Sequence, residues 1–374
     1  MDPHTVVPPY VAGPLRLEPF RALMLVPRRV GDPSTGRAFA RPYKDVAARL
    51  TRWQRRGLLV RDEEQALYLH EYTAGGMSIR GLVGALDVSR RATRHEDRAV
   101  LPHEGIHPAQ ADDLADRMAE MGLNPAPILL VHRGGTATRT LLASVTSGEP
   151  DHQFVDRSEQ QHRIWAIRDP AALATIRDDL AGTRALIADG HHRYAAYLRL
   201  QRRQPGGPCD HGLAMLVDQA TTPLFLGAIH RSLAGTSLDD LRAASESVGM
   251  QCSSHTHAEA VAALGPHRLA ATDGDAWAVV DLGAATADLA AVEVLHRQLV
   301  PALPHGPASI GYHHTVDEAL ATTALGSTVA VLMPAPSFDQ VLGIAEADRL
   351  LPEKATSFQP KPSLGVFIRS FEDD

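Results

Sequence analysis

The segment from Arg184 to Arg203 constrains the fold more than any other part of the chain. Its first half, RALIAD, is an apolar run of strand length, and its second half, HHRYAAYLRLQRR, has the spacing of an amphipathic helix. Gly190 separates the two halves and marks a turn. The residues before them, HRIWAI and DPAALATIRDDLAG, repeat the order of strand and helix. Such alternation predicts strands paired around crossover helices, and therefore an α/β protein of α+β character.

Helix and strand patterns continue on both sides of this segment. Toward the N-terminus they predict a helix from Pro42 to Gly57, strands at ALYLHEY and IRGLVGALDV, a helix at 109–123 and a strand at 127–133. Between residues 133 and 161 the chain is rich in turn residues and shows no clear pattern. Beyond the central segment, GLAMLVD and LFLGAIHR each predict one strand. Helices and strands alternate again from about residue 237.

These changes of pattern divide the 374-residue chain into three parts. We expect an N-terminal α+β unit over residues 1–99, a central catalytic module over 100–235, and a C-terminal α/β unit with a basic closing tail over 236–374. A chain of this length has enough residues to build two or three domains with cores of their own.

Composition excludes several classes of function. The 37 Lys and Arg residues are outnumbered by 44 Asp and Glu, so the formal charge is −7 and no basic field exists to hold a nucleic acid. The sequence has no run of 18 apolar residues and no secretory signal pattern at its start. Two cysteines cannot build a disulfide framework. We therefore expect a cytoplasmic protein that binds neither nucleic acid nor a membrane.

The turn from Asp189 to Arg193 carries the strongest chemical signal in the chain. A helix N-terminus exposes unpaired N–H groups and the positive end of the helix dipole. Gly190 lets a ligand approach the backbone, while His191, His192 and Arg193 supply donors that match phosphate oxygens. Asp189 could hold Mg²⁺ or orient one of the histidines. The alternative is purely structural: one histidine caps the helix, and Arg193 pairs with a neighbouring carboxylate.

The sequence His103-Glu104-Gly105-Ile106-His107 spells HExxH, the signature of zinc peptidases. That motif works only when both histidines point from one helical turn. Gly105 weakens such a turn, and Pro108 would clash with the carbonyl of Glu104. We therefore interpret residues 101–108 as a loop that precedes the helix at 109–123.

Glu104 is our candidate for a general base, because a carboxylate ahead of a helix can take a proton from a hydroxyl. The alternative is an ordinary surface glutamate. Two basic clusters could offset phosphate charge in a transition state: His230 with Arg231 at the end of an apolar strand, and Lys354 with Lys361 among prolines. A solvent-exposed C-terminal loop explains the two lysines equally well. Because no GxxxxGK[ST] motif occurs, a nucleotide would need another scaffold.

The order of several motifs resembles a widespread bacterial family known only as a domain of unknown function. The motifs run from about residue 17 to residue 368 and are LEPFRAL, GLLVRDEEQALYLHEY, LPHE, DRMAEMGLNPAPILLV, LIADGHHRYAAYL, AIHR and LPEKATSFQPKP. The stretch from His103 to Arg193 also resembles the core of ParB and sulfiredoxin-like proteins, above all the free serine kinases. Those enzymes transfer a phosphoryl group from a nucleotide to the hydroxyl of free L-serine.

The resemblance implies a ParB/sulfiredoxin-like central module with ATP or ADP and Mg²⁺ as cofactors. It places Glu104, beside His103, in the role of base toward the hydroxyl. It also implies that the motif from Asp189 to Arg193 holds the nucleotide phosphates and Mg²⁺. The chain departs from the family pattern at residues 31–43, where GDPSTGRAFARPY replaces a proline-rich segment, at Gly105 and at Ala355. These changes touch substrate contacts, so the identity of the acceptor stays open.

We expect a nucleotide-dependent kinase that phosphorylates a small hydroxyl compound, first of all free L-serine to O-phosphoserine. One alternative is a non-catalytic nucleotide-binding switch or partner-binding module, which could lose Glu104 without losing its nucleotide. Another is a zinc-dependent hydrolase that uses His103, Glu104 and His107. The sequence decides neither between ATP and ADP nor between a monomer and a homodimer.

Overall fold

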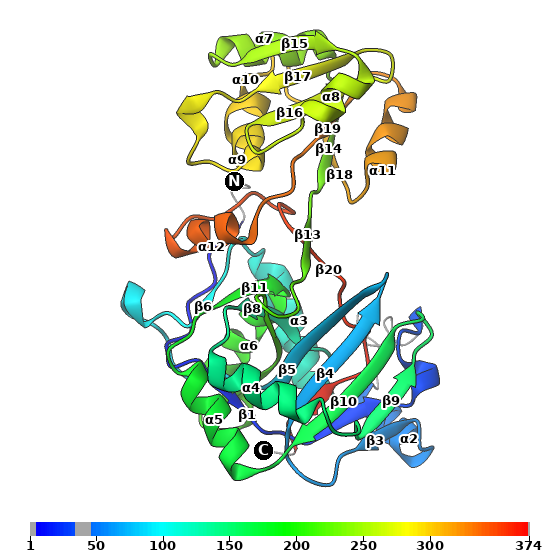
Figure 1. Cartoon of the computed structure of the whole chain (residues 1–374), viewed down its shortest axis with the longest axis vertical. Helices are drawn as coiled ribbons and strands as arrows, with labels where there is room; N and C mark the ends of the chain where they lie inside the picture. The colour runs from blue at the N-terminus through cyan, green and yellow to red at the C-terminus, as the bar shows by residue number, and fades with distance from the viewer. Residues whose placement is uncertain (1–4, 34–45, 373–374) are drawn as a thin grey trace. The chain divides into compact units, whose positions relative to one another are not determined.

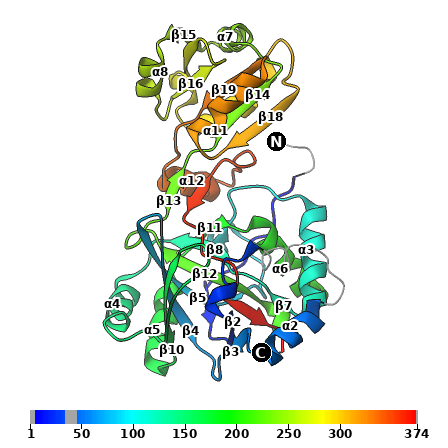
Figure 2. The ribbon, with the colours of Figure 1, turned by 90° about the vertical axis from the view of Figure 1, so that its right-hand side faces the viewer.

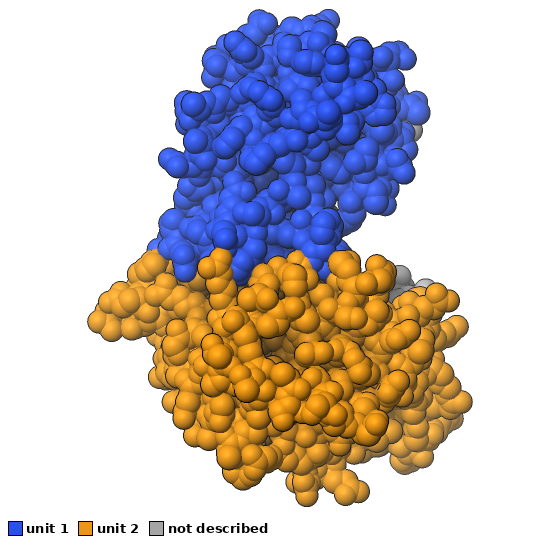
Figure 3. Space-filling view, in the orientation of Figure 1, with its two compact units in different colours: residues 1–3, 103–105, 225–359 blue, residues 4–102, 106–224, 360–374 orange. Residues whose placement is uncertain are grey.

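A computed structural model of the chain describes residues 5–33 and 46–372 (Figure 1). The described residues form two compact units, which Figure 3 shows in different colours. Unit 1 comprises residues 103–105 and 225–359, and unit 2 comprises residues 5–102, 106–224 and 360–372. The chain therefore leaves unit 2 for the three residues 103–105 and then returns to it.

Unit 2 contains most of the elements that precede residue 220. Its strands are β1 (Leu17–Glu18), β2 (Ala22–Leu25), β3 (Leu59–Arg61), β4 (Leu67–Ala74), β5 (Met77–Asp87), β6 (Val100–Leu101), β7 (Leu123–Asn124), β8 (Ile128–His132), β9 (His152–Val155), β10 (Gln161–Ile167), β11 (Ala185–Asp189), β12 (His211–Asp218) and β21 (Ile368–Ser370). Its α-helices are α2 (Val46–Arg55), α3 (Pro108–Met121), α4 (Thr136–Val145), α5 (Pro170–Leu180) and α6 (His191–Arg203).

The main sheet of unit 2 has the strand order β6-β11-β8-β12-β5-β4-β10-β9, with β1 paired to β5. Strand β8 runs parallel to β12, and β6 runs parallel to β11, while the other neighbours are antiparallel. Every residue of β8 is buried, as expected of a strand covered on both faces. A second, smaller sheet has the order β3-β2-β21-β7.

Helices cover the main sheet in two pairs. Helix α3 packs against α6, and α4 packs against α5. Figure 2 shows the two pairs on opposite sides of the strands. The buried residues of α6 include Tyr194 and Tyr197, whose hydroxyls donate to the carbonyls of Pro9 and Leu213. These contacts fix α6, and with it the turn at its N-terminus, to the body of unit 2.

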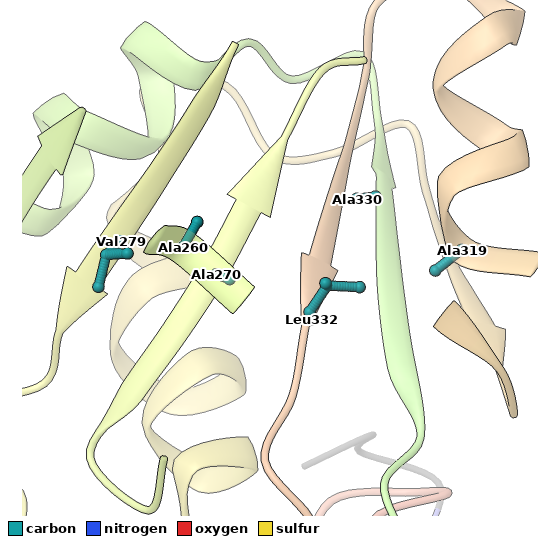
Figure 4. Close-up of a cluster of buried hydrophobic side chains, with 6 residues drawn as sticks. All are labelled: Ala260, Ala270, Val279, Ala319, Ala330 and Leu332. Carbon is teal, nitrogen blue, oxygen red and sulfur yellow. The ribbon is translucent and has the colours of Figure 1, made fainter. Parts of the chain in front are cut away.

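Unit 1 is built on a six-stranded antiparallel sheet of order β15-β17-β16-β19-β14-β18. Its elements are β13 (Phe225–Gly227), β14 (His230–Ala234), α7 (Leu238–Ser247), β15 (Gln251–His255), α8 (His257–Ala263), β16 (Arg268–Thr272), β17 (Trp277–Asp281), α9 (Ala291–Val294), a π-helical turn (Leu295–Leu299), α10 (Val300–Ala302), β18 (Ser309–His313), α11 (Val316–Ala321), β19 (Thr328–Leu332), α12 (Phe338–Glu346) and β20 (Ser357–Gln359). Figure 4 shows the core on this sheet, where small side chains of β16 and β19 let α8 and α11 pack closely.

The mixed α/β character predicted from the sequence is confirmed. The strands at β4, β5, β8, β10, β11 and β12 and the helices α3, α5 and α6 lie where the patterns placed them. The helix predicted from Pro42 is present as α2, although its predicted start lies outside the described residues. Helix α3 ends earlier than Asn124, because Gly122 adopts a left-handed conformation with φ 66°.

Two details of the predicted fold are wrong, and two elements were not predicted. The elements not predicted are helix α4 and strand β9, within residues 133–161, where the sequence shows no clear pattern. Strands β10 and β11 do not pair around helix α5, since β10 lies between β4 and β9, and β11 lies between β6 and β8. The run LFLGAIHR forms two short strands, β13 and β14, which belong to different sheets.

The division at residues 99/100 and 235/236 stays a prediction. The structure adds that β4 and β5, from the first of the three parts, pair with β10 and β12, from the second. Within the described residues, no helix has the length and apolar character needed to span a membrane.

Candidate functional site

The turn between β11 and α6 has the backbone conformation that only glycine adopts easily. Strand β11 ends at Asp189, and α6 begins at His191, so the predicted strand–turn–helix unit is confirmed. Gly190 between them has φ 95°. A Cβ at this position would lie 3.0 Å from Cγ2 of Ile128 and 3.1 Å from the guanidinium of Arg193. The first N–H groups of such a helix have no partner within the helix, so the turn presents donors.

Two cations converge on the carboxylate of Asp189 beside this turn. Nη2 of Arg193 donates to Oδ2 at 2.5 Å, and Nζ of Lys361 donates to Oδ1. Burial by itself raises the pKa of Asp189, but the charges of Arg193 and Lys361 outweigh it and hold that pKa below its usual value. Asp189 is therefore ionised at neutral pH. One negative charge faces two positive charges and a helix N-terminus, so the turn carries an excess of positive potential.

Lys361 reaches Asp189 because its backbone is held by unit 2. The carbonyl of Pro360 accepts a hydrogen bond from the Tyr72 hydroxyl at 2.6 Å, and the carbonyl of Lys361 accepts one from Nε2 of Gln160 at 3.0 Å. Lys361 itself is half exposed on its side chain. The basic tail predicted from the sequence thus brings one of its two lysines to the turn.

The two histidines of the turn have different surroundings. His191 is buried, and burial lowers its pKa to about 4, against the opposing effect of Asp189, so its ring is neutral. Nε2 of His192 accepts a hydrogen bond at 3.0 Å from the backbone N–H of His107, the residue that precedes α3. The structural alternative is thus present in part, since Arg193 pairs with a neighbouring carboxylate and His192 satisfies a helix end.

In unit 1, Glu104 is held by the segment that precedes β20. Its Oε1 accepts a hydrogen bond from the backbone N–H of Ala355 at 3.2 Å and one from the Thr356 hydroxyl at 3.5 Å. The neighbouring His103 is fully buried, and its Nε2 shares a hydrogen bond of 2.8 Å with the same hydroxyl. The backbone N–H of Leu351 also donates to the carbonyl of His103 at 2.8 Å. The HE motif and the LPEKAT segment, which the sequence separates, thus form one cluster.

Arg231 is the centre of this cluster and is fully buried. Its Nη1 donates to the carbonyl of Ile229 at 2.6 Å, and its Nη2 donates to the carbonyl of Lys354 at 3.0 Å. Its Nε donates to Nε2 of His296 at 3.0 Å, within the π-helical turn. Burial lowers the pKa of Arg231 to about 10, which leaves it charged at neutral pH. These bonds fix the backbone on which Glu104 depends.

His230 and Lys354 complete the predicted residues of unit 1. Nδ1 of His230 accepts a hydrogen bond from the backbone N–H of Met333 at 3.0 Å, and burial lowers its pKa. The ammonium of Lys354 lies 4.8 Å from the ring centre of Tyr312, and Arg231 lies over the same ring at 4.7 Å. Lys354 adopts a left-handed conformation with φ 52°, which is uncommon for a residue other than glycine.

A cavity of about 310 Å³ in unit 1 touches this cluster at two residues, Ile229 and Ala355. Most of its other walls are apolar, including Ala291 and Met333. Among the described residues that line it, none is Asp, Glu, Lys or Arg. The cavity therefore suits an uncharged organic group better than a zwitterion.

The HExxH spelling does not form a zinc-peptidase helix. Helix α3 begins at Pro108, so His103 and Glu104 lie in the predicted loop and not on one turn with His107. Across residues 5–33 and 46–372, no three His, Cys, Asp or Glu side chains group in a way that could hold a metal ion.

The predicted site residues fall into two groups. Unit 2 brings together Asp189, Gly190, His191, His192, Arg193 and Lys361, and unit 1 brings together His103, Glu104, His230, Arg231 and Lys354. The sequence analysis missed Thr356, Tyr312 and His296 as their partners. A hydroxyl within LPEKAT was the one signal that could have pointed to Thr356. No local pattern marks the other two.

Comparison with known proteins places the chain in a family. A family model described as "Protein of unknown function (DUF1015)" matches residues 18–294. The chain belongs to the DUF1015 family. No curated protein matches this DUF1015 chain.

Several solved structures resemble the DUF1015 chain at low identity. A free serine kinase in complex with AMP has 16% identity and a TM-score of 0.40, over 72% of this chain and 88% of that one. SbnI from Staphylococcus aureus, with a C-terminal truncation, has 12% identity and a TM-score of 0.43, over 72% and 83%. A conserved hypothetical protein from Pyrococcus furiosus has 14% identity and a TM-score of 0.38, over 72% and 91%.

Proposed function

We propose that this protein transfers a phosphoryl group from ATP or ADP to the hydroxyl of a small compound. The observation that carries the proposal is the turn at Gly190, where Arg193 and Lys361 meet a single carboxylate at the N-terminus of a 13-residue helix. The positive charge of Arg193, Lys361 and the helix N-terminus exceeds the single negative charge of Asp189. A turn with this excess of positive charge suits phosphate best. The resemblance of the DGHHR motif to that of the free serine kinases supports the same assignment.

In this proposal the residues of unit 2 bind the donor. The backbone N–H groups after Gly190 and the two cations hold the phosphates, and Asp189 is the residue that would hold Mg²⁺. A single protein carboxylate fits Mg²⁺, because this ion usually keeps its remaining ligands from phosphate and water. When bound, Mg²⁺ offsets charge on the phosphate oxygens.

Glu104 acts as the base in the same proposal. As the acceptor oxygen bonds to the terminal phosphorus, its proton passes to the Glu104 carboxylate, and the bond from phosphorus to the bridging oxygen breaks to release the shortened nucleotide. The N–H of Ala355 and the hydroxyl of Thr356 hold one oxygen of the carboxylate that accepts the proton, and so orient it. Arg231 positions this segment from within the core and does not contact substrate.

A product assay tests the proposal. The protein is incubated with ATP or ADP and Mg²⁺, together with a panel of acceptors that contains L-serine, other amino acids and uncharged alcohols. We expect a product heavier by one phosphoryl group, detected by mass, from at least one acceptor. Failure of every acceptor with both nucleotides, despite nucleotide binding, would refute the kinase.

One observation favours a second candidate, a nucleotide-binding switch without catalysis. Glu104 already accepts hydrogen bonds from Ala355 and Thr356, so it has a structural role that needs no substrate. A switch of this kind would bind the nucleotide and release it unchanged. The same assay separates the two candidates, because only a kinase makes a phosphorylated product.

A further inference from the structure

A second cavity lies in unit 2 where strands β8 and β12 end. The two strands are parallel, and their last residues, His132 and Asp218, are direct neighbours. Helix α4 begins at Thr136, after Gly134 and Gly135. A cavity of about 150 Å³ opens at this point. The crevice outside the carboxyl ends of parallel strands is where α/β folds commonly bind ligands.

This cavity is distinct from the turn at Gly190. Ile128, at the start of β8, is the residue nearest to a Cβ at Gly190, whereas His132 is at the other end of the same strand. The two residues are four positions apart along the strand, or about 13 Å. The inference therefore does not depend on the proposed kinase function.

Two buried polar side chains line the cavity without hydrogen-bond partners. His132 and Thr138 are each 4% exposed. Among the residues that the structure describes, Nδ1 of His132 and Oγ1 of Thr138 have no hydrogen-bond partner. Buried polar groups in folded proteins are rarely left unpaired, because the loss of water is then uncompensated. Two such groups on one cavity wall point to a ligand that supplies the missing bonds.

The charged side chains that line the cavity are already paired. Asp218 accepts from Nε of Arg139 at 2.6 Å and from the backbone N–H of Gly134 at 3.1 Å. Asp179 accepts from the backbone N–H of Thr138 at 3.1 Å, which satisfies a donor at the N-terminus of α4. Arg80 pairs with Glu71 at 2.6 Å. The three charged side chains that line the cavity, Arg80, Arg139 and Asp218, thus have their counter-charges already, so the site suits a neutral ligand.

The size and the walls of the cavity set the rest of the ligand's chemistry. Leu82, Leu142, Ala143 and Leu216 give it an apolar lining. A Cβ at Gly134, which also lines the cavity, would lie 2.8 Å from Oδ2 of Asp218, so a larger residue does not fit there without a shift. A cavity of roughly 150 Å³ accommodates a molecule of the size of benzene.

We propose that this cavity binds a neutral ring compound of about the size of benzene or phenol. Its ring packs between the leucines of β5, α4 and β12, and a hydroxyl or ring nitrogen on its edge pairs with His132 and Thr138. Neutral phenols and single-ring nitrogen heterocycles share this chemistry.

Three ring compounds of similar size and different charge test the proposal: phenol, benzoate and benzylammonium. Binding to the full-length protein is followed by NMR signals of each compound under titration, and its place by crystal structure. We expect saturable binding of phenol in the cavity, with benzoate and benzylammonium at least tenfold weaker. Equal binding of all three, or no saturable binding of phenol, would overturn the proposal and leave a site for water.

Two variants locate the binding. Ala143 lines the cavity, so Ala143→Phe places a ring at its wall and should abolish phenol binding. Ser144 does not line the cavity, so Ser144→Phe adds the same ring at the next position and should leave binding unchanged. Thr138→Val keeps the shape but removes the hydroxyl, and should weaken phenol at least threefold. Unchanged melting temperatures show that the variants fold. Retention of phenol binding by a folded Ala143→Phe protein would contradict the proposal.

Discussion

Oε1 of Glu104 accepts a hydrogen bond from the backbone N–H of Ala355 at 3.2 Å, although 251 residues separate the two along the chain. The same segment carries Lys354, whose carbonyl accepts from the fully buried Arg231. A carboxylate held by a backbone that is itself held by a buried guanidinium has a fixed orientation. Such fixing is what a general base needs, because proton transfer depends on geometry before it depends on pKa.

Replacing Glu104 by Gln removes the proposed base and keeps the hydrogen bonds to Ala355 and Thr356 possible. We expect the rate of phosphoryl transfer to fall by about two orders of magnitude or more, with nucleotide affinity unchanged. The exposed Glu353→Gln is the control and should leave the rate as it is. A Glu104→Gln protein with full activity would rule out Glu104 as the base.

Replacing Gly190 by Ala should disturb the phosphate turn. A residue other than glycine at φ 95° is strained, and the new Cβ would press on Ile128 and Arg193. We expect a loss of about 1–3 kcal/mol in the free energy of unfolding and at least tenfold weaker ADP binding by calorimetry. Gly182→Ala, where no atom lies within 4 Å of the added Cβ, is the matched control. Equal ADP affinity in both variants would contradict the assignment of the turn at Gly190 as the phosphate-binding site.

Lys361→Met should weaken nucleotide binding by removing one of the two cations at Asp189. Because the interaction is electrostatic, the affinity difference between wild type and variant should shrink as salt is raised. Arg203→Met, at the far end of α6, also removes one positive charge and serves as the control. If the two variants lose affinity equally, the effect comes from net charge and not from this site.

Arg231→Met should destabilise unit 1. The substitution leaves the buried carbonyl of Ile229 and the partly buried carbonyl of Lys354 without their donor, and we expect the free energy of unfolding in urea to fall by about 3 kcal/mol or more. Nucleotide affinity of the remaining folded protein should be unchanged. Reduced affinity at full stability would instead make Arg231 a phosphate contact.

Stability should fall in mild acid because of buried histidines such as His191. Burial lowers its pKa to about 4 in the folded protein, against the ordinary histidine value of 6.5, while Asp189 opposes the shift and His192 and Lys361 add to it. The unfolded chain therefore binds more protons between these values, so stability is constant above about pH 6.5 and falls toward pH 4. Protonation of one such buried histidine lowers the free energy of unfolding by about 3 kcal/mol in total.

Urea unfolding at several pH values checks this prediction. His191→Asn removes one titrating group and should flatten the acid branch of the stability curve, whereas the exposed His152→Asn should not. If His191→Asn shifts the unfolding free energy equally at every pH and leaves the slope of the acid branch unchanged, His191 is not one of the groups whose protonation destabilises the protein.

The parts of the fold that sequence predicts well are those set by neighbouring residues. Strand β11, Gly190 and helix α6 follow from an apolar run, a glycine and a helical spacing within 20 residues of one another. Helix α4 was missed because its sequence, TATRTLLASV, is rich in Thr and Ser and begins without a side-chain cap. Its packing against α5 supplies what its own residues lack.

Strand partners and the cluster around Glu104 could not be predicted for a different reason. The sequence gives no register between segments far apart, so the pairing of β10 with β4 had to come from the structure. The candidate residues themselves were found by their chemistry. Arg231 was predicted as a phosphate contact, and nothing local in AIHR shows that its partners are the carbonyls of 353 and 354.

The most direct test of the account is a crystal structure of the protein with ADP and Mg²⁺. The account predicts that a phosphate of ADP lies within hydrogen-bonding distance of the backbone N–H groups that follow Gly190, with Arg193 or Lys361 turned from Asp189 toward it. A nucleotide bound elsewhere, with Asp189 still paired to both cations and the turn unoccupied, would contradict it.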